Sequence, residues 1–218
     1  MLVVKTISVT LYEQNARILY DDASKACVIV DPGGDVPKIL TQIPSDAQLS
    51  AIWITHSHID HVSGVKAILD EFSAHSIDVI SHADDHVNRE NLAMQSEMFQ
   101  FPYSGDFDTT QHCKDGDFLT IGTYRFLVLH TPGHAIGHVS FYSDDDNQFK
   151  APVLIAGDAL FKGSIGRTDL PGGNHQQLLD SIQNKLFVLP LHTVVCPGHG
   201  PNTTIDNEIS TNPFFLDS

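Results

Sequence analysis

The stretch Thr55-His56-Ser57-His58-Ile59-Asp60-His61 determines how the rest of the chain is interpreted. It follows an apolar run, residues 49–54, that predicts a short buried strand, and it precedes residues 62–72, where apolar side chains recur at helical spacing. Three imidazoles and a carboxylate therefore crowd a turn between a strand and a helix. Burying these groups without partners is costly, whereas they are common ligands of transition metals. The stretch predicts a metal site.

Three later turns follow the same plan, because each carries a possible ligand directly after a predicted strand. The ligands are His134, Asp158 and His199, and each has a neighbouring glycine. Glycine lets the backbone turn tightly and approach an ion closely. One such turn alone is a weak signal. The three turns together with residues 55–61 make coincidence an implausible account.

Composition restricts the class of partner. The 218 residues include 12 Lys and Arg against 27 Asp and Glu, for a formal net charge of −15. This balance argues against nucleic acid or an anionic membrane as the main partner, since both require basic surface. It is compatible with a small-molecule substrate, and it gives no basis for an oligomeric state.

The cysteines and the N-terminus indicate a cytoplasmic protein. Cys27, Cys113 and Cys196 are odd in number and widely spaced, which favours reduced thiols over a disulfide framework. The first residues lack the pattern of a signal peptide, and no apolar run approaches the length of a membrane span.

Hydrophobic periodicity predicts alternating strands and helices in both halves of the chain. The expected strands are residues 2–9, 16–20, 26–30, 49–54, 77–80, 118–121, 124–129, 139–142, 153–156 and 192–196. The expected helices are residues 35–43, 62–72, 83–101 and 176–189, with Asp35, Asp84 and Asp85 as capping residues. We find no repeat and no linker. The pattern predicts two packed sheets with helices outside, in one layered domain over residues 1–218.

Several residues near the motifs have competing interpretations. Asp31 either accepts a hydrogen bond from a ligating histidine or only forms the turn before Pro-Gly-Gly. His138 is interpreted as structural and Cys196 as a core residue. The helical stripe of Leu92, Met94 and Met98 is interpreted as core rather than as a substrate groove.

The motifs resemble those of the metallo-β-lactamase superfamily, and within it the short glyoxalase II-like (hydroxyacylglutathione hydrolase-like) proteins. The matching segments are residues 157–161, 166–173, 197–201 and 212–214. Together with residues 55–61 they extend the resemblance over essentially the whole chain. The resemblance implies an α/β fold, a four-layer αββα sandwich with the metals at one sheet edge. It also implies a single domain without the extra C-terminal helical domain of the longer glyoxalase II enzymes.

The resemblance further implies a set of metal ligands. A first metal would be held by His56, His58 and His134, and a second by Asp60, His61 and His199, with Asp158 bridging both. Imidazole and carboxylate suit two Zn²⁺ ions, with Fe or Mn as alternatives. Such a pair shares a hydroxide that attacks a carbonyl, and Asp60 would orient it. Asp60 and Asp158 are therefore the expected catalytic residues.

The resemblance implies hydrolysis of a glutathione thioester such as S-D-lactoylglutathione. Arg167 is the candidate for binding a glutathione carboxylate, and the alternative is an Arg167–Asp169 pair that braces the loop. Lys162 is a second candidate. The chain departs from the longer enzymes at Asp169 and Pro201, where they offer tyrosines.

Two other activities stay open at this point. A glutathione persulfide dioxygenase has the same fold and would use one Fe(II) on His56, His134 and Asp158. A lactone or ester hydrolase would use the same hydroxide chemistry. A β-lactamase is less favoured, because it would ordinarily carry cysteine in place of Asp158.

Overall fold

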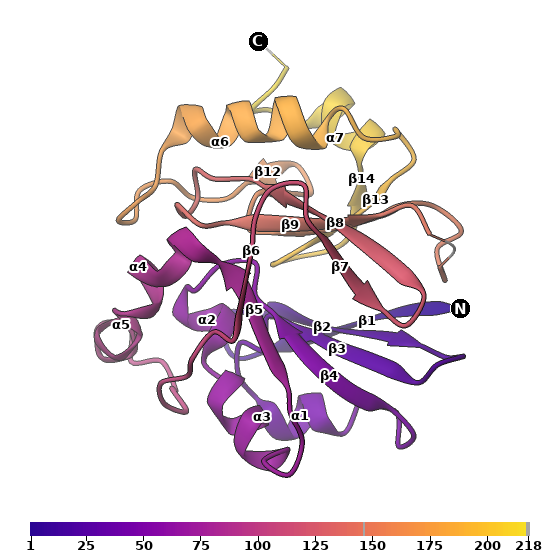
Figure 1. The fold of residues 1–218 in the computed structure, drawn as a ribbon. Helices are drawn as coiled ribbons and strands as arrows, with labels where there is room; N and C mark the ends of the chain where they lie inside the picture. Colours follow the sequence, from indigo (N-terminus) through magenta and orange to yellow (C-terminus); the bar gives the residue numbers. More distant parts are fainter. Residues whose placement is uncertain (146, 217–218) are drawn as a thin grey trace.

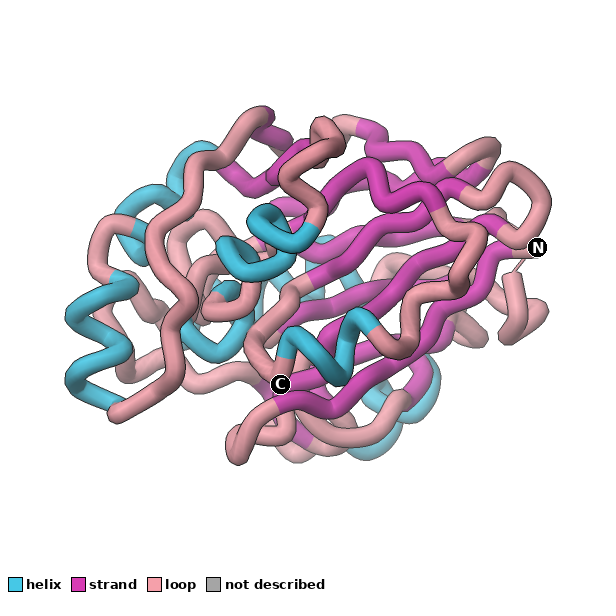
Figure 2. Tube along the Cα trace, turned by 90° about the horizontal axis from the view of Figure 1, so that it is seen from below, coloured by secondary structure: helices cyan, strands magenta, loops and turns pink. Residues whose placement is uncertain are grey.

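Two six-stranded sheets lie face to face, and helices cover their outer faces (Figure 1). The computed structural model describes residues 1–145 and 147–216. The strand orders are β1-β2-β3-β4-β5-β6 and β14-β13-β10-β9-β8-β7. Figure 2 shows helical segments and loops gathered beyond one end of the strands. The predicted αββα sandwich of the α/β class is confirmed.

The first sheet comes from the N-terminal half of the chain. Its strands are β1 (Leu2–Val9), β2 (Gln14–Asp21), β3 (Ala26–Val30), β4 (Gln48–Trp53), β5 (Asp78–His82) and β6 (Gln111–Cys113). Strands β1 to β3 pair antiparallel, and β3 to β6 pair parallel. The helices of this half are α1 (Val36–Leu40), α2 (Ile59–Val62), α3 (Val65–Glu71), α4 (His86–Arg89) and α5 (Leu92–Phe99).

The second sheet comes from the C-terminal half. Its strands are β7 (Phe118–Ile121), β8 (Tyr124–His130), β9 (Val139–Ser143), β10 (Val153–Gly157), β13 (Val194–Pro197) and β14 (Thr203–Thr204), and a separate small hairpin is formed by β11 (Leu160–Phe161) and β12 (Ser164–Ile165). The outer face carries α6 (His175–Ser181), its π-helical continuation η2 (Ile182–Leu186), and α7 (Ile205–Thr211).

The predicted helix over residues 62–72 is interrupted because its first residues bond to the preceding loop. Ser63 Oγ donates to the carbonyl of Gly33 (2.7 Å), and a Cβ on Gly64 would lie 2.8 Å from the carbonyl oxygen of Pro32. The chain therefore ends α2 at Val62 and begins α3 at Val65.

Two other helix predictions were wrong in detail. Asp35 has a left-handed backbone (φ 46°), and its carboxylate accepts from the backbone of Thr10 (2.7 Å) instead of capping α1, which ends at Leu40. The expected helix over residues 83–101 divides into the short 3-10 turn η1 (Ala83–Asp85), α4 and α5. Asn91 separates α4 from α5, with its side chain donating to the carbonyl of Val87 (2.7 Å).

The core between the sheets is built around Trp53, the last residue of β4. Its indole is 1% exposed and contacts Phe126 and Phe141 of the opposite sheet, with ring centroids 5.4 and 5.3 Å apart. The three cysteines are free, as expected, and all three are buried. Within the described part of the chain, no helix has the length and apolarity needed to cross a bilayer.

Replacing Trp53 tests this packing. We expect Trp53→Ala to lower the free energy of unfolding by about 3–5 kcal/mol, because the cavity it leaves lies between two sheets that cannot both collapse into it. Urea unfolding followed by circular dichroism measures the change. Val188→Ala, at a position that is 70% exposed, is the control and should change stability by less than about 0.5 kcal/mol. Equal stabilities of the two variants would contradict the central role of Trp53.

Candidate metal centre

The seven predicted ligands converge at one edge of the two sheets. β3 and β4 are parallel, as are β10 and β13, so the turns that follow each pair lie side by side. β8 runs in the same direction as β10, because both pair antiparallel with β9. Three groups of possible ligand atoms each lie within 4.8 Å of one another: His56, His58 and His134; His56, His61 and Asp158; and Asp60, His61 and His199.

The second ring nitrogen of each of three histidines is held by a fixed acceptor. His134 Nδ1 lies 2.7 Å from the carbonyl oxygen of Arg167, and His199 Nδ1 lies 3.0 Å from that of Tyr12. His61 Nδ1 lies 3.0 Å from Oδ2 of Asp31. Because these oxygens can only accept, each Nδ1 carries a proton, and each Nε2 faces the centre.

The lone pairs at the centre fit a cation. His56 Nδ1 lies 3.0 Å from Thr55 Oγ1, which itself donates to Asp31, so Nδ1 of His56 also carries the proton. The Nε2 atoms of His56 and His134 therefore face each other at 3.1 Å without a proton between them. His61 Nε2 and Asp158 Oδ1 are buried 3.3 Å apart, and among the described residues neither atom has a hydrogen bond of good geometry. Nitrogen and oxygen atoms arranged in this way are suitable ligands for a Zn, Fe or Mn ion.

Asp31 supports the centre from below. Its carboxylate accepts from the backbone N–H of Thr55 (2.7 Å), from Thr55 Oγ1 (2.6 Å) and from His61 Nδ1 (3.0 Å). These bonds tie the end of β3 to the loop that follows β4. Of its two interpretations, the supporting role is therefore confirmed.

The Asp158 turn is held by His138 and by glycines. His138 is buried, with Nε2 accepting from the backbone N–H of Asp158 (3.0 Å), so its predicted structural role is confirmed. Gly157 has φ 52°, a conformation that disfavours a side chain. A Cβ on Gly198 would lie 2.0 Å from Oδ1 of Asp158. Cys196 is buried in the core, as predicted.

Asp85 has a role that sequence reasoning missed. It was expected to cap a helix, but it is buried and accepts from the backbone N–H of Ser57 (3.0 Å), while Ser57 Oγ donates to its other oxygen. Ser57 lies between His56 and His58, so Asp85 fixes the loop that carries both. The partners are 28 residues apart, and no local pattern marks the pair.

Burial and charge set the protonation of the ligands. Burial lowers the pKa of His56 well below its usual value and that of His58 to about 3, so both are neutral. For Asp158, burial opposes ionisation, but the imidazole of His61 outweighs it and lowers the pKa of the carboxyl. For His61, the carboxylates of Asp158 and Asp60 outweigh burial and raise the pKa. A cation at the centre would displace that proton.

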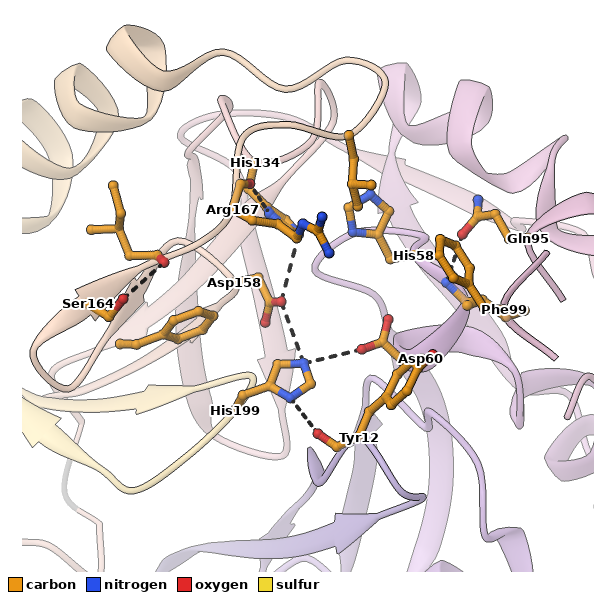
Figure 3. Close-up of a pocket in the computed structure, with 14 residues that line it drawn as sticks. Tyr12, His58, Asp60, Gln95, Phe99, His134, Asp158, Ser164, Arg167 and His199 are labelled. Atoms are coloured by element: carbon orange, nitrogen blue, oxygen red, sulfur yellow. Dashed lines mark hydrogen bonds and ion pairs between the residues drawn. The ribbon is translucent and has the colours of Figure 1, made fainter. Parts of the chain in front are cut away.

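A cavity of about 400 Å³ opens over the centre (Figure 3). Arg167 lies on its wall, and its guanidinium forms two bonds with the carboxylate of Asp169 (2.7 and 2.8 Å). The bracing pair therefore exists in the structure, and Arg167 also lies beside the cavity. Lys162 instead lines a separate hollow with Asn202 and Thr203, a placement that does not support contact with a ligand in the cavity.

Asp85 makes the stability of the metal-free protein depend on pH. Burial raises the pKa of Asp85 to about 7 in spite of the bonds from Ser57, against 3.8 as a reference. The folded state thus retains a proton that the unfolded chain releases, and stability falls as pH rises from about 4 to about 7. We expect Asp85→Asn to remove this fall. The difference in melting temperature between Asp85→Asn and the wild type should therefore increase by several degrees in favour of the variant from pH 5 to pH 8.

Thermal unfolding of chelator-treated protein, followed by circular dichroism, measures this difference. Asp108→Asn, at an exposed position, is the control and should stay at a constant offset from the wild type. If the melting temperature of Asp85→Asn differed from that of the wild type by the same amount at every pH, the raised pKa of Asp85 would be contradicted.

Comparison with known proteins agrees with this geometry. The profile of the metallo-beta-lactamase superfamily matches residues 13–199. The chain is 33% identical over 214 residues to hydroxyacylglutathione hydrolase GloC of Haemophilus influenzae, covering 97% of each. It resembles the crystal structure of the BLEG-1 B3 metallo-beta-lactamase with a TM-score of 0.86 and 42% identity, covering 98% of this chain and 99% of that one. For TTHA1623 in a di-iron-bound form, the TM-score is 0.83 and the identity 31%, with 96% and 99% covered. The chain therefore belongs to the metallo-β-lactamase superfamily and is a metal-dependent hydrolase.

Proposed function

We propose that this protein is a dinuclear thioester hydrolase that cleaves glutathione thioesters such as S-D-lactoylglutathione. The observation that carries the proposal is the presence of two groups of ligands around one carboxylate, Asp158, beneath one cavity. The GloC relative, a hydroxyacylglutathione hydrolase by name, supports the choice of substrate.

In this proposal Asp158 lies between the two ions. Its Oδ1 lies 3.3 Å from His61 Nε2, and its Oδ2 lies 3.7 Å from His134 Nε2 and 3.6 Å from His199 Nε2. The carboxylate thus lies between the two histidine groups, as a bridging carboxylate requires. His56, His58 and His134 would hold one ion, and Asp60, His61 and His199 the other. Zinc and iron are the main candidates, and the di-iron form of TTHA1623 supports iron.

Two bound divalent cations would lower the pKa of a water molecule to about 7 and polarise a substrate carbonyl. Asp60 would accept a hydrogen bond from that water and orient it towards the carbonyl carbon. Asp60 lines the cavity beside His199, with its Oδ2 atom 3.2 Å from His199 Nε2. The thiol of glutathione has a pKa of about 8.5 and leaves as a thiolate, so no side chain has to protonate it.

A β-lactam hydrolase is the second candidate function. The observation in its favour is the 42% identity to a structure described as a B3 metallo-beta-lactamase, over nearly the whole chain. Both reactions would use the same ligands and the same attack on a carbonyl. The substrates differ in what the cavity wall must bind, so direct assay with a chromogenic cephalosporin separates them.

The first test is hydrolysis of S-D-lactoylglutathione together with metal analysis of the same sample. We expect turnover with about two ions per chain, and Asp158→Ala should lose at least about 100-fold in kcat/KM together with much of the metal. Asp108→Ala, at an exposed position, is the matched control and should retain both. One iron per chain with oxygen uptake on glutathione persulfide would replace the hydrolase by the dioxygenase. Full activity of Asp158→Ala with metal bound would refute the bridging role.

The Arg167–Asp169 pair offers a test of glutathione recognition. If Arg167 binds a glutathione carboxylate, Arg167→Ala should raise KM about 5- to 20-fold with a smaller effect on kcat. Asp169→Asn should lower KM about two- to threefold, because it releases the guanidinium from an exposed pair that contributes little to stability. Steady-state kinetics on S-D-lactoylglutathione measure both.

Lys162→Ala provides the comparison, since Lys162 lines the separate hollow and should leave KM unchanged. A raised KM in Lys162→Ala with no effect of Arg167→Ala would assign glutathione recognition to the other basic residue.

A further inference from the structure

The helix α5 exposes large apolar side chains beside the metal centre. Met94 is 54% exposed, Met98 67% and Phe99 40%, whereas Leu92 is buried. The interpretation of Leu92, Met94 and Met98 as one core stripe is therefore correct only for Leu92. The two methionines instead line a hollow of about 170 Å³ that reaches His58. We name this hollow the methionine pocket.

The methionine pocket adjoins the cavity over the metal centre. Its walls come from α4 and α5 on one side and from Leu170 and Pro171 on the other. Four residues line both spaces: His58, Gln95, Phe99 and Leu170. Figure 3 shows Gln95 and Phe99 on the side of the cavity beyond His58, away from Ser164. A molecule whose carbonyl lies at the ions can therefore extend directly into the pocket.

The chemistry of the pocket selects an uncharged chain. None of the described residues that line it is Asp, Glu, Lys or Arg, although the protein has 39 of these residues. Two of its side-chain amides are engaged: Gln95 accepts from the backbone N–H of Ile59 (3.1 Å) and donates to the carbonyl of Asn88 (3.1 Å), and Asn91 donates to the carbonyl of Val87 (2.7 Å). Unbranched methionine side chains adapt their shape to a flexible apolar ligand.

We propose that the methionine pocket binds the acyl chain of the thioester substrate and that the preferred acyl group is an apolar chain of about six carbons. The inference rests on the proposed thioester hydrolysis and adds the class of acyl group and its direction. The volume sets the length, since a methylene group takes roughly the space of a water molecule, about 30 Å³. Ser164 and Arg167 are polar residues that line the cavity outside the methionine pocket, and the thiol part is assigned to them.

A series of glutathione thioesters tests the proposal with the metal-loaded protein. We expect kcat/KM to rise about two- to fourfold per methylene from acetyl through butyryl to hexanoyl, because each buried methylene adds apolar contact, and to level off at octanoyl. A second series with one acyl group and thiols of increasing apolar length should show no such rise.

Variants of the pocket locate the effect. Met94→Gln/Met98→Gln keeps chain length and helix propensity but makes the wall polar, and it should reduce the hexanoyl-to-acetyl ratio of kcat/KM at least about fivefold. Leu191→Gln, at a position on the surface that is likewise exposed and apolar, is the matched control and should keep the wild-type ratio.

The outcomes separate this inference from the proposed function. Hydrolysis of all acyl groups at equal efficiency, or an unchanged ratio in the double variant, overturns the methionine pocket as acyl site and leaves the hydrolase intact. A rise with the length of the thiol instead overturns the direction of binding. No hydrolysis of any thioester overturns the proposed function and the acyl site with it.

Discussion

The Nε2 lone pairs of His56 and His134 face each other at 3.1 Å, and a cation is what relieves their repulsion. The geometry follows from the acceptors on the far sides of the rings, which leave each imidazole one orientation and one tautomer. The His56 ring donates to Thr55 Oγ1, which itself donates to Asp31 at the end of β3, and the His134 ring donates to the backbone carbonyl of Arg167 beyond β12. The hydrogen bonds behind the histidines therefore hold these strand ends in place, and the centre forms where the two sheets meet.

The convergence of the candidate ligands was predictable because each stands in a short local pattern, a strand followed by a tight turn. Asp31 was half-predictable, since the same residue can form a turn or accept from a ligand, and only the packing of two strands decides between these roles. The bond from Asp85 to Ser57 was not predictable, because it joins residues with no pattern of their own. The exposure of Met98 was equally hidden, because periodicity identifies an apolar stripe without showing whether another element covers it.

The strands were predicted better than the helices. β4 and β10 are covered on one face by the opposite sheet and on the other by helices, so both are largely apolar and are clearly marked in the sequence. The helices at the site edge are short, and their ends are decided by tertiary bonds such as the one from Ser63 Oγ to the carbonyl of Gly33. Propensity alone joins such pieces into one long helix. The errors in the predicted helices therefore lie mainly beside the candidate site, where tertiary hydrogen bonds decide the helix ends.

The division of the ligands between the two halves of the chain makes the centre a cross-link. His56 and His134 are 78 residues apart. The three cysteines are free, so none of them cross-links the chain. An ion that binds both closes a loop of that length in the same way as a disulfide, an effect of about 4 kcal/mol in the chain-entropy picture. The bond differs from a disulfide in being independent of redox conditions and reversible by loss of the ion. With ions bound, the two sheets would be fastened together by the same centre that acts on a substrate.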